Sequence, residues 1–416
     1  MRSRPGVADP LTVTDGQRHV PTFAELAGDE SQFFQDYFDR APLLRRAALQ
    51  GNPESVLSIA DLDEILHSKA IRFPHVQISR HGDDVPADEF TESIEVGNKL
   101  VPDAVIPSRV VEYFKVGSTI AWSALHHFMP NMREMASALS EKFATQCGVT
   151  AMLTPASKQG FYPHCDRVDV FAVQLLGTKD WRVWPTLEAR KGDAPHFSAS
   201  GEELGQPVIE TTLNPGDILY LPNGTPHVAA TANSVSLHLI VMIKPRRWSE
   251  LLKFIVAEII DNDPSFWDVA YLGEGRGDAL AESLSDQVQA LASRLEKLDR
   301  HDAVARIMTQ ARPEPALPTS QPLADMVRAD DISTMTRVRR SPHAVIADRG
   351  LAEDTRRARM SVDGKIYEMH VSVAAALVKL DVNAEVLAGE FLDDRPAENS
   401  ARAVQTLCRM GALELV

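Results

Sequence analysis

The sequence predicts an α+β protein with an antiparallel double-sheet barrel or sandwich at its centre. Between residues 148 and 245, apolar runs rich in β-branched residues alternate with Gly, Pro, Asn and Asp roughly every 8–12 residues. No helical pattern of roughly 10–15 residues lies between these runs, which argues against a parallel α/β sheet. The predicted strands are VTAMLT, VDVFAVQLL, DWRVWP, VIETTL, DILYLP and SVSLHLIVMI.

The region before the barrel is predicted to be mixed. Residues 1–20 have no apolar periodicity and are expected to form a flexible lead-in, whereas the segment TFAELAGDESQFFQDYFDRAPLLRR begins with a Thr cap and has helical spacing. Between 71 and 117, runs such as IRFPHVQIS and RVVEYFKVG predict short strands. Residues 120–146 predict one or two helices.

The region after the barrel, residues 246–312, is predicted to be helical. Its apolar residues recur at steps of three and four, which fits either a core-facing helix or the seam of a helix–helix dimer. The stripe consists of Leu280, Leu284, Val288, Leu291, Leu295 and Leu298.

A Pro-rich linker over residues 313–325 is expected to precede a separate domain over 326–416. In that domain a turn at 362–365 separates two strand-like runs, and helical patterns follow at 371–380 and 399–410. A winged-helix-like module fits this order. Three basic residues precede this turn, Arg356, Arg357 and Arg359. They could contact DNA, as winged helices often do, but in an acidic chain a charged face exposed to solvent is the commoner explanation.

Composition narrows the class of protein. The 416 residues exceed the size of one core, so two or three domains are expected, and 44% hydrophobic content suffices to fill them. The N-terminal segment lacks the apolar run of a secretory signal, and no run is long enough to span a bilayer. Three cysteines without metal-ligand spacing fit a reducing cytosol, so we expect a soluble cytoplasmic protein without a membrane partner. A formal charge of −15 makes nucleic acid an improbable partner and is compatible with a basic one.

The predicted barrel contains three residues that could bind one metal ion. His164 and Asp166 are two positions apart, so in an extended chain their side chains point to the same face. In PGDILYLPNGTPH, a buried strand followed by a Pro/Gly turn presents His227. The stretch between Asp166 and His227 has room for about four strands.

Two His and one carboxylate on one side of a metal leave three coordination positions open, as an iron(II) oxygenase needs for a bidentate oxo acid and dioxygen (O2). Structural zinc is more often held by a closed tetrahedral set of sulfur and nitrogen ligands. His81-Gly82-Asp83 has the same spacing but lies in a polar turn without a downstream partner strand. The alternative is that His164 and Asp166 are two polar residues at the barrel mouth that form hydrogen bonds within the protein and bind no metal.

Lys179 is a second candidate site residue, because it begins a predicted buried strand two residues before Trp181. A buried Lys is costly unless it is paired, and the C5 carboxylate of 2-oxoglutarate would pair it. The alternative is a surface Lys beside Asp180.

At these residues the sequence resembles the jumonji C (JmjC) family, and within it the ribosomal oxygenase or cupin-4 group. The resemblance rests on LTPASKQGFYPHCDRVDVFAVQLLGTKDWRVW, on PGDILYLPNGTPH, on SLHL and on FFQDYFDRAPLLRRAA. It implies a jumonji C domain over 21–245, whose core at 148–245 is a double-stranded β-helix (cupin or jelly-roll) barrel. It also implies a helical dimerisation region over 246–312 and a C-terminal winged helix.

The resemblance further implies that His164, Asp166 and His227 bind iron(II), Fe(II), and that Lys179 binds the cosubstrate 2-oxoglutarate. Where the group has an Asn and a Tyr before the first ligand, this chain has Thr150 and Met152. Its Ser on the last barrel strand corresponds to Met242, which leaves Thr154, in phase with 150 and 152, as a substitute cosubstrate contact. Cys165 is expected to face away from the metal into the core.

The leading functional hypothesis is therefore hydroxylation of an amino-acid side chain in a protein, with a basic ribosomal protein as the first candidate. Oxidation of a peptide in natural-product biosynthesis is a second hypothesis, and a non-enzymatic binding module is a third. Demethylation of methylated lysine is chemically possible, but nothing in the sequence selects it. A homodimer is expected from the leucine-rich stripe and the resemblance.

Overall fold

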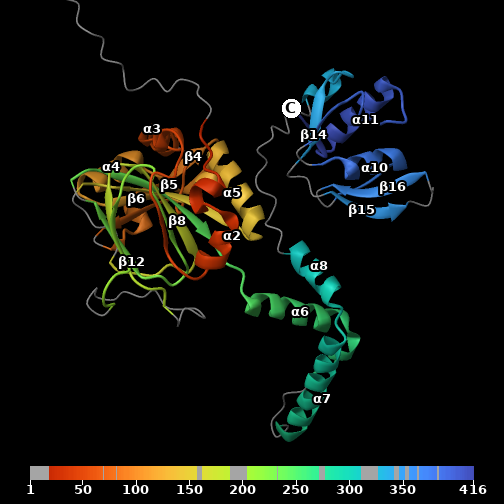
Figure 1. Ribbon diagram of the computed structural model, residues 1–416, viewed down its shortest axis with the longest axis horizontal. Helices are drawn as coiled ribbons and strands as arrows, with labels where there is room; N and C mark the ends of the chain where they lie inside the picture. Colours follow the sequence, from red (N-terminus) through yellow and green to blue (C-terminus); the bar gives the residue numbers. More distant parts are fainter. Residues whose placement is uncertain are drawn as a thin grey trace, which may run out of the picture. The chain divides into compact units, whose positions relative to one another are not determined.

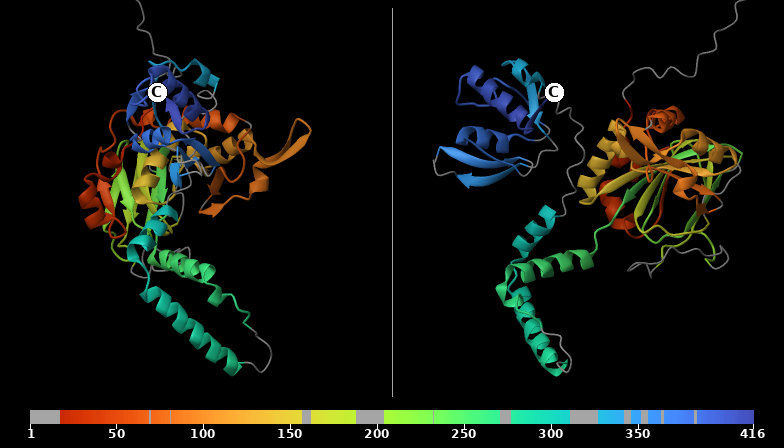
Figure 2. Two further views of the ribbon diagram at one scale, coloured as in Figure 1. Left: turned by 90° about the vertical axis from the view of Figure 1, so that its right-hand side faces the viewer. Right: turned by 180° about the vertical axis from the view of Figure 1, so that it is seen from behind.

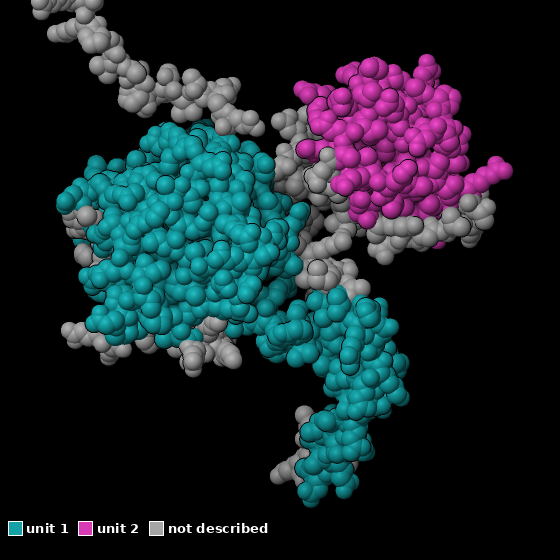
Figure 3. All heavy atoms as spheres, in the orientation of Figure 1, with its two compact units in different colours: residues 1–313 teal, residues 314–416 magenta. Residues whose placement is uncertain are grey.

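The computed structural model describes most of the chain in two compact units (Figure 1). The units are Met1–Pro313 and Glu314–Val416, which have separate colours in Figure 3. The described residues are 18–68, 70–80, 82–156, 162–187, 204–231, 233–270, 277–310, 327–341, 346–351, 356–362, 365–381 and 384–416. The predicted linker at 313–325 lies outside these ranges, as do residues 1–17 of the predicted lead-in.

The first unit is built on a large antiparallel sheet, as the sequence predicts. Its strands follow the order β1 (Leu43–Arg45), β11 (Ile218–Leu221), β8 (Asp169–Leu176), β13 (Ser236–Ile243), β7 (Cys147–Thr154), β6 (Thr119–Trp122), β2 (Val76–Arg80) and β3 (Asp83–Asp84). A second sheet has the order β10 (Ile209–Leu213), β9 (Lys179–Val183) and β12 (His227–Thr231). All six predicted strands are present, and β12, which begins at His227 directly after the predicted Pro/Gly turn, is an additional strand that the sequence analysis did not assign.

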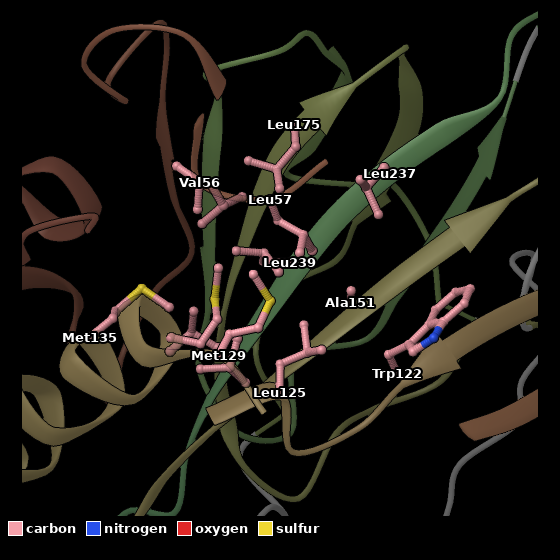
Figure 4. Close-up of a cluster of buried hydrophobic side chains, with 14 of the residues drawn as sticks. Val56, Leu57, Trp122, Leu125, Met129, Met135, Ala151, Leu175, Leu237 and Leu239 are labelled. Carbon is pink, nitrogen blue, oxygen red and sulfur yellow. The ribbon is translucent and has the colours of Figure 1, made fainter. Parts of the chain in front are cut away.

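The large sheet buries both of its faces. On β13, alternate residues such as Leu237 and Leu239 belong to the largest apolar core, part of which Figure 4 shows beside Val56 and Leu57. The other alternate residues of β13 face the second sheet, where a smaller core surrounds Trp181. Because strand side chains alternate between faces, one strand serves both an apolar core and the barrel interior.

The outer face of the large sheet is covered by N-terminal elements. Helix α1 (Phe23–Ala27) begins at a capping box formed by Thr22 and Glu25, and Phe33 packs against aromatic rings of the sheet. The predicted N-terminal helix is therefore confirmed in its first part, but its end forms β1 because Leu43–Arg45 pair with β11. The covering elements also include α2 (Glu30–Gln32), the π-helix η1 (Phe33–Tyr37), η2 (Pro53–Ser55), α3 (Ile59–His67) and α5 (Pro130–Phe143).

Two predictions before the barrel are wrong. The run RVVEYFKVG is not a strand but lies in helix α4 (Pro107–Lys115), where Pro107 occupies the first turn and Val110 is buried. The first part of the segment expected to be helical forms β6, because it pairs with β2 and β7. Aromatic and β-branched content misled the first assignment, and in both cases pairing and packing decided the structure.

Short elements complete this region. The hairpin of β4 (Thr91–Val96) and β5 (Lys99–Val105), orange in Figure 2, joins β3 to α4 and turns at Gly97, which has a positive φ of 60°. The 3₁₀ helices are η3 (Ala87–Glu89) and η4 (Leu125–His127).

The described part of the region after the barrel is helical, as expected. Helix α6 (Trp248–Asn262) packs against both α7 (Gly277–Glu296) and α8 (Arg300–Gln310). The 3₁₀ helix η6 (Pro264–Phe266) follows α6, and Asp263 pairs with Arg294 of α7 at 2.7 Å. No residue of α7 is buried, so the structure does not bury its apolar stripe in a core. No described helix is long and apolar enough to cross a membrane.

The second unit has its own apolar core, which includes Met360, Leu377 and Val404. One sheet has the order β18 (Glu385–Leu387), β14 (Arg337–Arg340) and β19 (Leu413–Leu415), and the other β15 (Ile346–Leu351), β16 (Arg357–Val362) and β17 (Lys365–His370). Its helices are η7 (Ala329–Asp331), α10 (Val371–Lys379) and α11 (Ala397–Arg409). The paired β16 and β17 and both helices stand where the sequence predicts them, although turn residues 363 and 364 lie outside the described chain.

The turn between β8 and β9 depends on Gly177, which has a φ of +62° and would place a Cβ 1.9 Å from the Val235 carbonyl oxygen. Gly177→Ala should lower the free energy of unfolding by more than about 2 kcal/mol, because left-handed strain and a backbone clash add together. Urea denaturation followed by circular dichroism measures this difference. Gly205→Ala is the matched control, since its φ is +74° and no described atom lies within 4 Å of the added Cβ. Equal losses in both variants would contradict the clash.

Candidate metal centre and active site

Three side chains from two separate segments converge at one end of the barrel interior. The Nε2 atoms of His164 and His227 lie 3.9 Å and 3.6 Å from the two carboxylate oxygens of Asp166. One ligand atom from each residue lies within 4.8 Å of the other two. The two imidazole rings are 4.4 Å apart between centroids, with His227 buried and the other two partly exposed.

The backbone brings these residues together. His164 and His227 form an antiparallel bridge in which each N–H donates to the other's carbonyl, at 3.1 and 2.9 Å. The amide of Gly224 donates to the Asp166 carbonyl at 3.0 Å. The two ligand segments are thus joined by backbone hydrogen bonds on both sides of the site, although β8, β9, β10 and β11 lie between them in the sequence.

Both imidazole rings are oriented to offer Nε2 to a metal ion. Nδ1 of His164 lies 2.8 Å from the Tyr162 carbonyl, and Nδ1 of His227 lies 3.0 Å from the Thr225 carbonyl. A carbonyl can only accept, so each Nδ1 carries the proton and each Nε2 keeps its lone pair. Burial lowers the pKa of His227, which also favours the neutral, ligating form. The donor set, tautomers and convergence therefore fit a divalent ion bound on one side by two nitrogens and one oxygen.

These ligands open into a cavity of about 270 Å³ between the two sheets. Trp181 stacks on His227 at 5.8 Å between ring centroids, and its other neighbour is the His238 ring at 6.0 Å. The lining residues are Gln77, Thr119, Ala121, Ser123, Thr150, Met152, His164, Asp166, Lys179, Trp181, His227, Ala229, His238, Ile240 and Met242.

Lys179 is buried in this cavity rather than exposed beside Asp180. Its Nζ donates to Thr154 Oγ1 at 3.4 Å, and burial lowers its pKa to about 7. Among the described lining residues the sole carboxylate is Asp166, the candidate metal ligand. A lysine in this position is costly for the protein alone and would be stabilised by an anion entering the cavity.

The other predicted residues occupy distinct places. Thr154 is fully buried and accepts hydrogen bonds from Lys179 and from Thr119, but it does not line the cavity; its contact with a cosubstrate stays a prediction. Thr150, Met152 and Met242 all line the cavity.

Cys165, which stands between His164 and Asp166 in the sequence, is buried. Its burial and, to a smaller extent, the charge of Asp166 raise the pKa of its thiol to about 11. The other His-x-Asp triplet does not enter the site. Asp83 is exposed on β3, and His81 lies outside the described residues.

The sequence analysis missed His238 and Trp181 as site residues. Both are buried and line the cavity. A signal existed in β13, where Ser236 and His238 interrupt an otherwise apolar strand at a spacing of two and so point to one face.

Comparison with known proteins agrees with this geometry. Residues 124–251 match the model of the JmjC domain. Ribosomal oxygenase 1 of Rattus norvegicus is 29% identical over 66% of this chain and 47% of its own length, and that of Homo sapiens is 30% identical over 54% and 34%. A Dictyostelium discoideum protein named bifunctional lysine-specific demethylase and histidyl-hydroxylase NO66 is 34% identical over 40% of this chain and 38% of its own length. The chain thus spans at most about half the length of these relatives.

Among solved structures, the Escherichia coli ribosomal oxygenase YcfD superposes with a TM-score of 0.51 over 94% of this chain and 99% of its own. Its 17% identity makes this a likeness of fold, which agrees with the mixed α+β architecture and the large antiparallel sheet. The JmjC match implies that the two sheets form a barrel of the cupin type. The chain is therefore a JmjC-domain protein related to the ribosomal oxygenases.

Proposed function

We propose that this chain is an iron(II)- and 2-oxoglutarate-dependent oxygenase that hydroxylates an amino-acid side chain in a protein. The observation that carries the proposal is a single cavity with an open two-His, one-carboxylate set at one end and a buried lysine within it. When bound, the metal and the oxo acid would supply the oxidising chemistry, in which dioxygen is reduced and 2-oxoglutarate is converted to succinate and carbon dioxide.

The residues of the chain would bind and orient the reactants. His164, Asp166 and His227 would hold the ion on one side and leave the remaining positions to the oxo acid and dioxygen. The charge of Lys179 would pair with the far carboxylate of the oxo acid. The aromatic and apolar wall, including Trp181 and Met242, would exclude water from the reacting end.

A ribosomal protein is the first substrate candidate. Relatives named ribosomal oxygenase and histidyl-hydroxylase support a protein side chain as the target. Ribosomal proteins are commonly basic, and the formal charge of −15 would favour encounter with such a partner. The lysine-specific demethylase activity in the NO66 name is a distinct outcome that product masses can separate from hydroxylation.

We further propose that the regions outside the barrel serve assembly rather than nucleic-acid binding. Helix α7 exposes its apolar stripe, with Leu284 and Val288 both more than half exposed, and its spacing suits pairing with a second copy. In the winged-helix-like domain proposed for the second unit, Arg357 and Arg359 both pair with Glu368, which reduces their availability to phosphates.

Succinate formation tests the oxygenase proposal directly. The purified protein with iron(II), ascorbate and 2-oxoglutarate should form succinate, and a ribosomal-protein extract should stimulate it. Asp166→Ala should lower turnover by at least about a hundredfold because it removes a candidate metal ligand. Asp83→Ala, in the other His-x-Asp triplet, is the matched control and should keep wild-type turnover.

Mass spectrometry of the extract then identifies the reaction. A gain of one oxygen atom on a peptide indicates hydroxylation, and loss of a methyl group indicates demethylation. No succinate and no binding of 2-oxoglutarate by calorimetry would contradict the oxygenase proposal and favour a binding module.

The lysine pKa predicts how cosubstrate binding depends on pH. With a pKa of about 7, Lys179 is charged below that pH and neutral above it in the free protein. A bound carboxylate favours the charged form, so binding requires proton uptake above about pH 7, and affinity for 2-oxoglutarate should fall by up to tenfold per pH unit there. Calorimetry with manganese(II) as the metal measures this slope. Lys179→Arg should abolish it, since Arg stays charged; a flat wild-type profile would contradict the prediction.

The assembly proposal predicts a dimer that depends on α7. Replacing Leu284 and Val288 together by Glu should convert the dimer to a monomer, because charges in an apolar seam lose their hydration. Light scattering coupled to size-exclusion chromatography gives the mass. Ser285→Glu with Gln289→Glu adds the same charges at the same spacing beside the stripe and should leave the dimer intact. A monomeric wild-type protein would contradict the proposal.

A further inference from the structure

A second basic side chain, His238, is buried in the cavity that contains Lys179. Its exposed fraction is 3%, and it lines the cavity from β13. Its ring packs edge-to-face with Trp181, at 6.0 Å and 86°. The series His227, Trp181, His238 therefore forms a continuous row of rings that starts at the candidate metal ligands.

Within the described chain, His238 has no hydrogen-bond partner. Its Nδ1 is fully buried and unpartnered, and so is the indole Nε1 of Trp181. Gln174 lies opposite His238 on β8, but its Nε2 donates to Leu176 O, Gly177 O and Ser236 Oγ instead. An unsatisfied buried polar group costs about 1–3 kcal/mol, so the protein by itself leaves polar groups of this wall without partners. A ligand in the cavity would reach His238 through its other ring nitrogen, Nε2, which also has no partner among the described residues.

The strand register places His238 near the charge of Lys179. On paired strands β13 and β7, Ser236 lies opposite Thr154, the hydrogen-bond partner of Lys179, and His238 lies opposite Met152. His238 is the next residue after Ser236 that faces inward, so it lies roughly 7 Å further along the strand than the contact between Lys179 and Thr154. Burial, and then the charge of Lys179, hold the pKa of His238 well below its ordinary range, so the imidazole is neutral and has one N–H to donate.

The expected ligand for this pair of residues is an anion. A lysine and an imidazole N–H are both donors, and no described lining residue except the metal-ligand candidate Asp166 is a carboxylate. Two donors that approach one group from different strands suit a carboxylate, which has two acceptor oxygens.

We propose that His238 is a cosubstrate-binding residue, whose neutral imidazole donates a hydrogen bond to the same distal carboxylate that Lys179 holds. This inference rests on the proposed function and deepens it, since it assigns a second protein contact to the dicarboxylate. His238 would thereby help the cavity select a 2-oxo dicarboxylic acid over a 2-oxo monocarboxylic acid.

The test compares two ligands that differ in that carboxylate alone. Calorimetry under anaerobic conditions, with manganese(II) as the metal, gives the Kd of 2-oxoglutarate, and competition gives the Kd of 2-oxopentanoate, which has the keto and C1 carboxylate groups but no C5 carboxylate. His238→Leu should raise the Kd of 2-oxoglutarate at least about tenfold and leave that of 2-oxopentanoate unchanged, because a hydrogen bond to a charged group is lost.

Two further variants separate hydrogen bonding from packing. His238→Gln retains an N–H donor and should restore the Kd of 2-oxoglutarate to within about threefold of wild type. His126→Leu is the matched control, since His126 is another histidine with a buried, unpartnered Nδ1 but does not line the cavity. Its Kd for 2-oxoglutarate should equal that of wild type, and thermal unfolding checks that every variant is folded.

Each contrary result has a separate meaning. Wild-type affinity in a folded His238→Leu variant would overturn the inference and leave the proposed function intact. Equal losses for both ligands, or no restoration by Gln, would also overturn it, because the role of His238 would then be packing. If the wild-type protein with metal binds no 2-oxoglutarate, the proposed function itself fails.

Discussion

The constraint on which the rest of this structure depends is that the eight-stranded sheet buries both of its faces. The outward side chains of β7, β8 and β13 need an apolar cover, which the N-terminal helices provide. The inward side chains are thereby enclosed between two sheets, where polar groups are withdrawn from water. A barrel enclosed in this way can hold a lysine and a histidine at positions where their interactions with a ligand would be strong.

Within that enclosure, backbone pairing determines the metal geometry. The antiparallel bridge between His164 and His227 brings together two segments separated by four strands, and each ring is then oriented by the carbonyl two residues before it. Local hydrogen bonds therefore select the Nε2 lone pairs before any ion arrives. His164 and Asp166 are partly exposed, whereas His227, Lys179 and His238 are buried.

The cavity wall contains both apolar and polar side chains besides the metal-ligand candidates. Met152, Ile240 and Met242 give it an apolar surface, whereas Lys179, His238 and the hydroxyl and amide side chains of the lining supply polar groups; the latter are Gln77, Thr119, Ser123 and Thr150. If the Asn, Tyr and Ser of the related group are replaced by Thr150, Met152 and Met242, as the alignment of motifs implies, recognition of an anion must rely on the remaining donors. The buried imidazole of His238 on β13 is one of these donors.

The sequence by itself determined six of the barrel strands, the metal-ligand candidates and the buried lysine, because period-two alternation and the His-x-Asp spacing are local properties of an extended chain. The tertiary structure alone decided that residues 107–115 form a helix and 119–122 a strand, since these short apolar runs suit either state until they find packing partners.

Two further contacts were decided by the structure alone. Thr154 accepts a hydrogen bond from Lys179, and the rings of His238 and Trp181 pack edge-to-face in the cavity wall. Their approach depends on how two sheets face each other. No spacing along the chain encodes that distance, because strands far apart in the sequence supply the two rings.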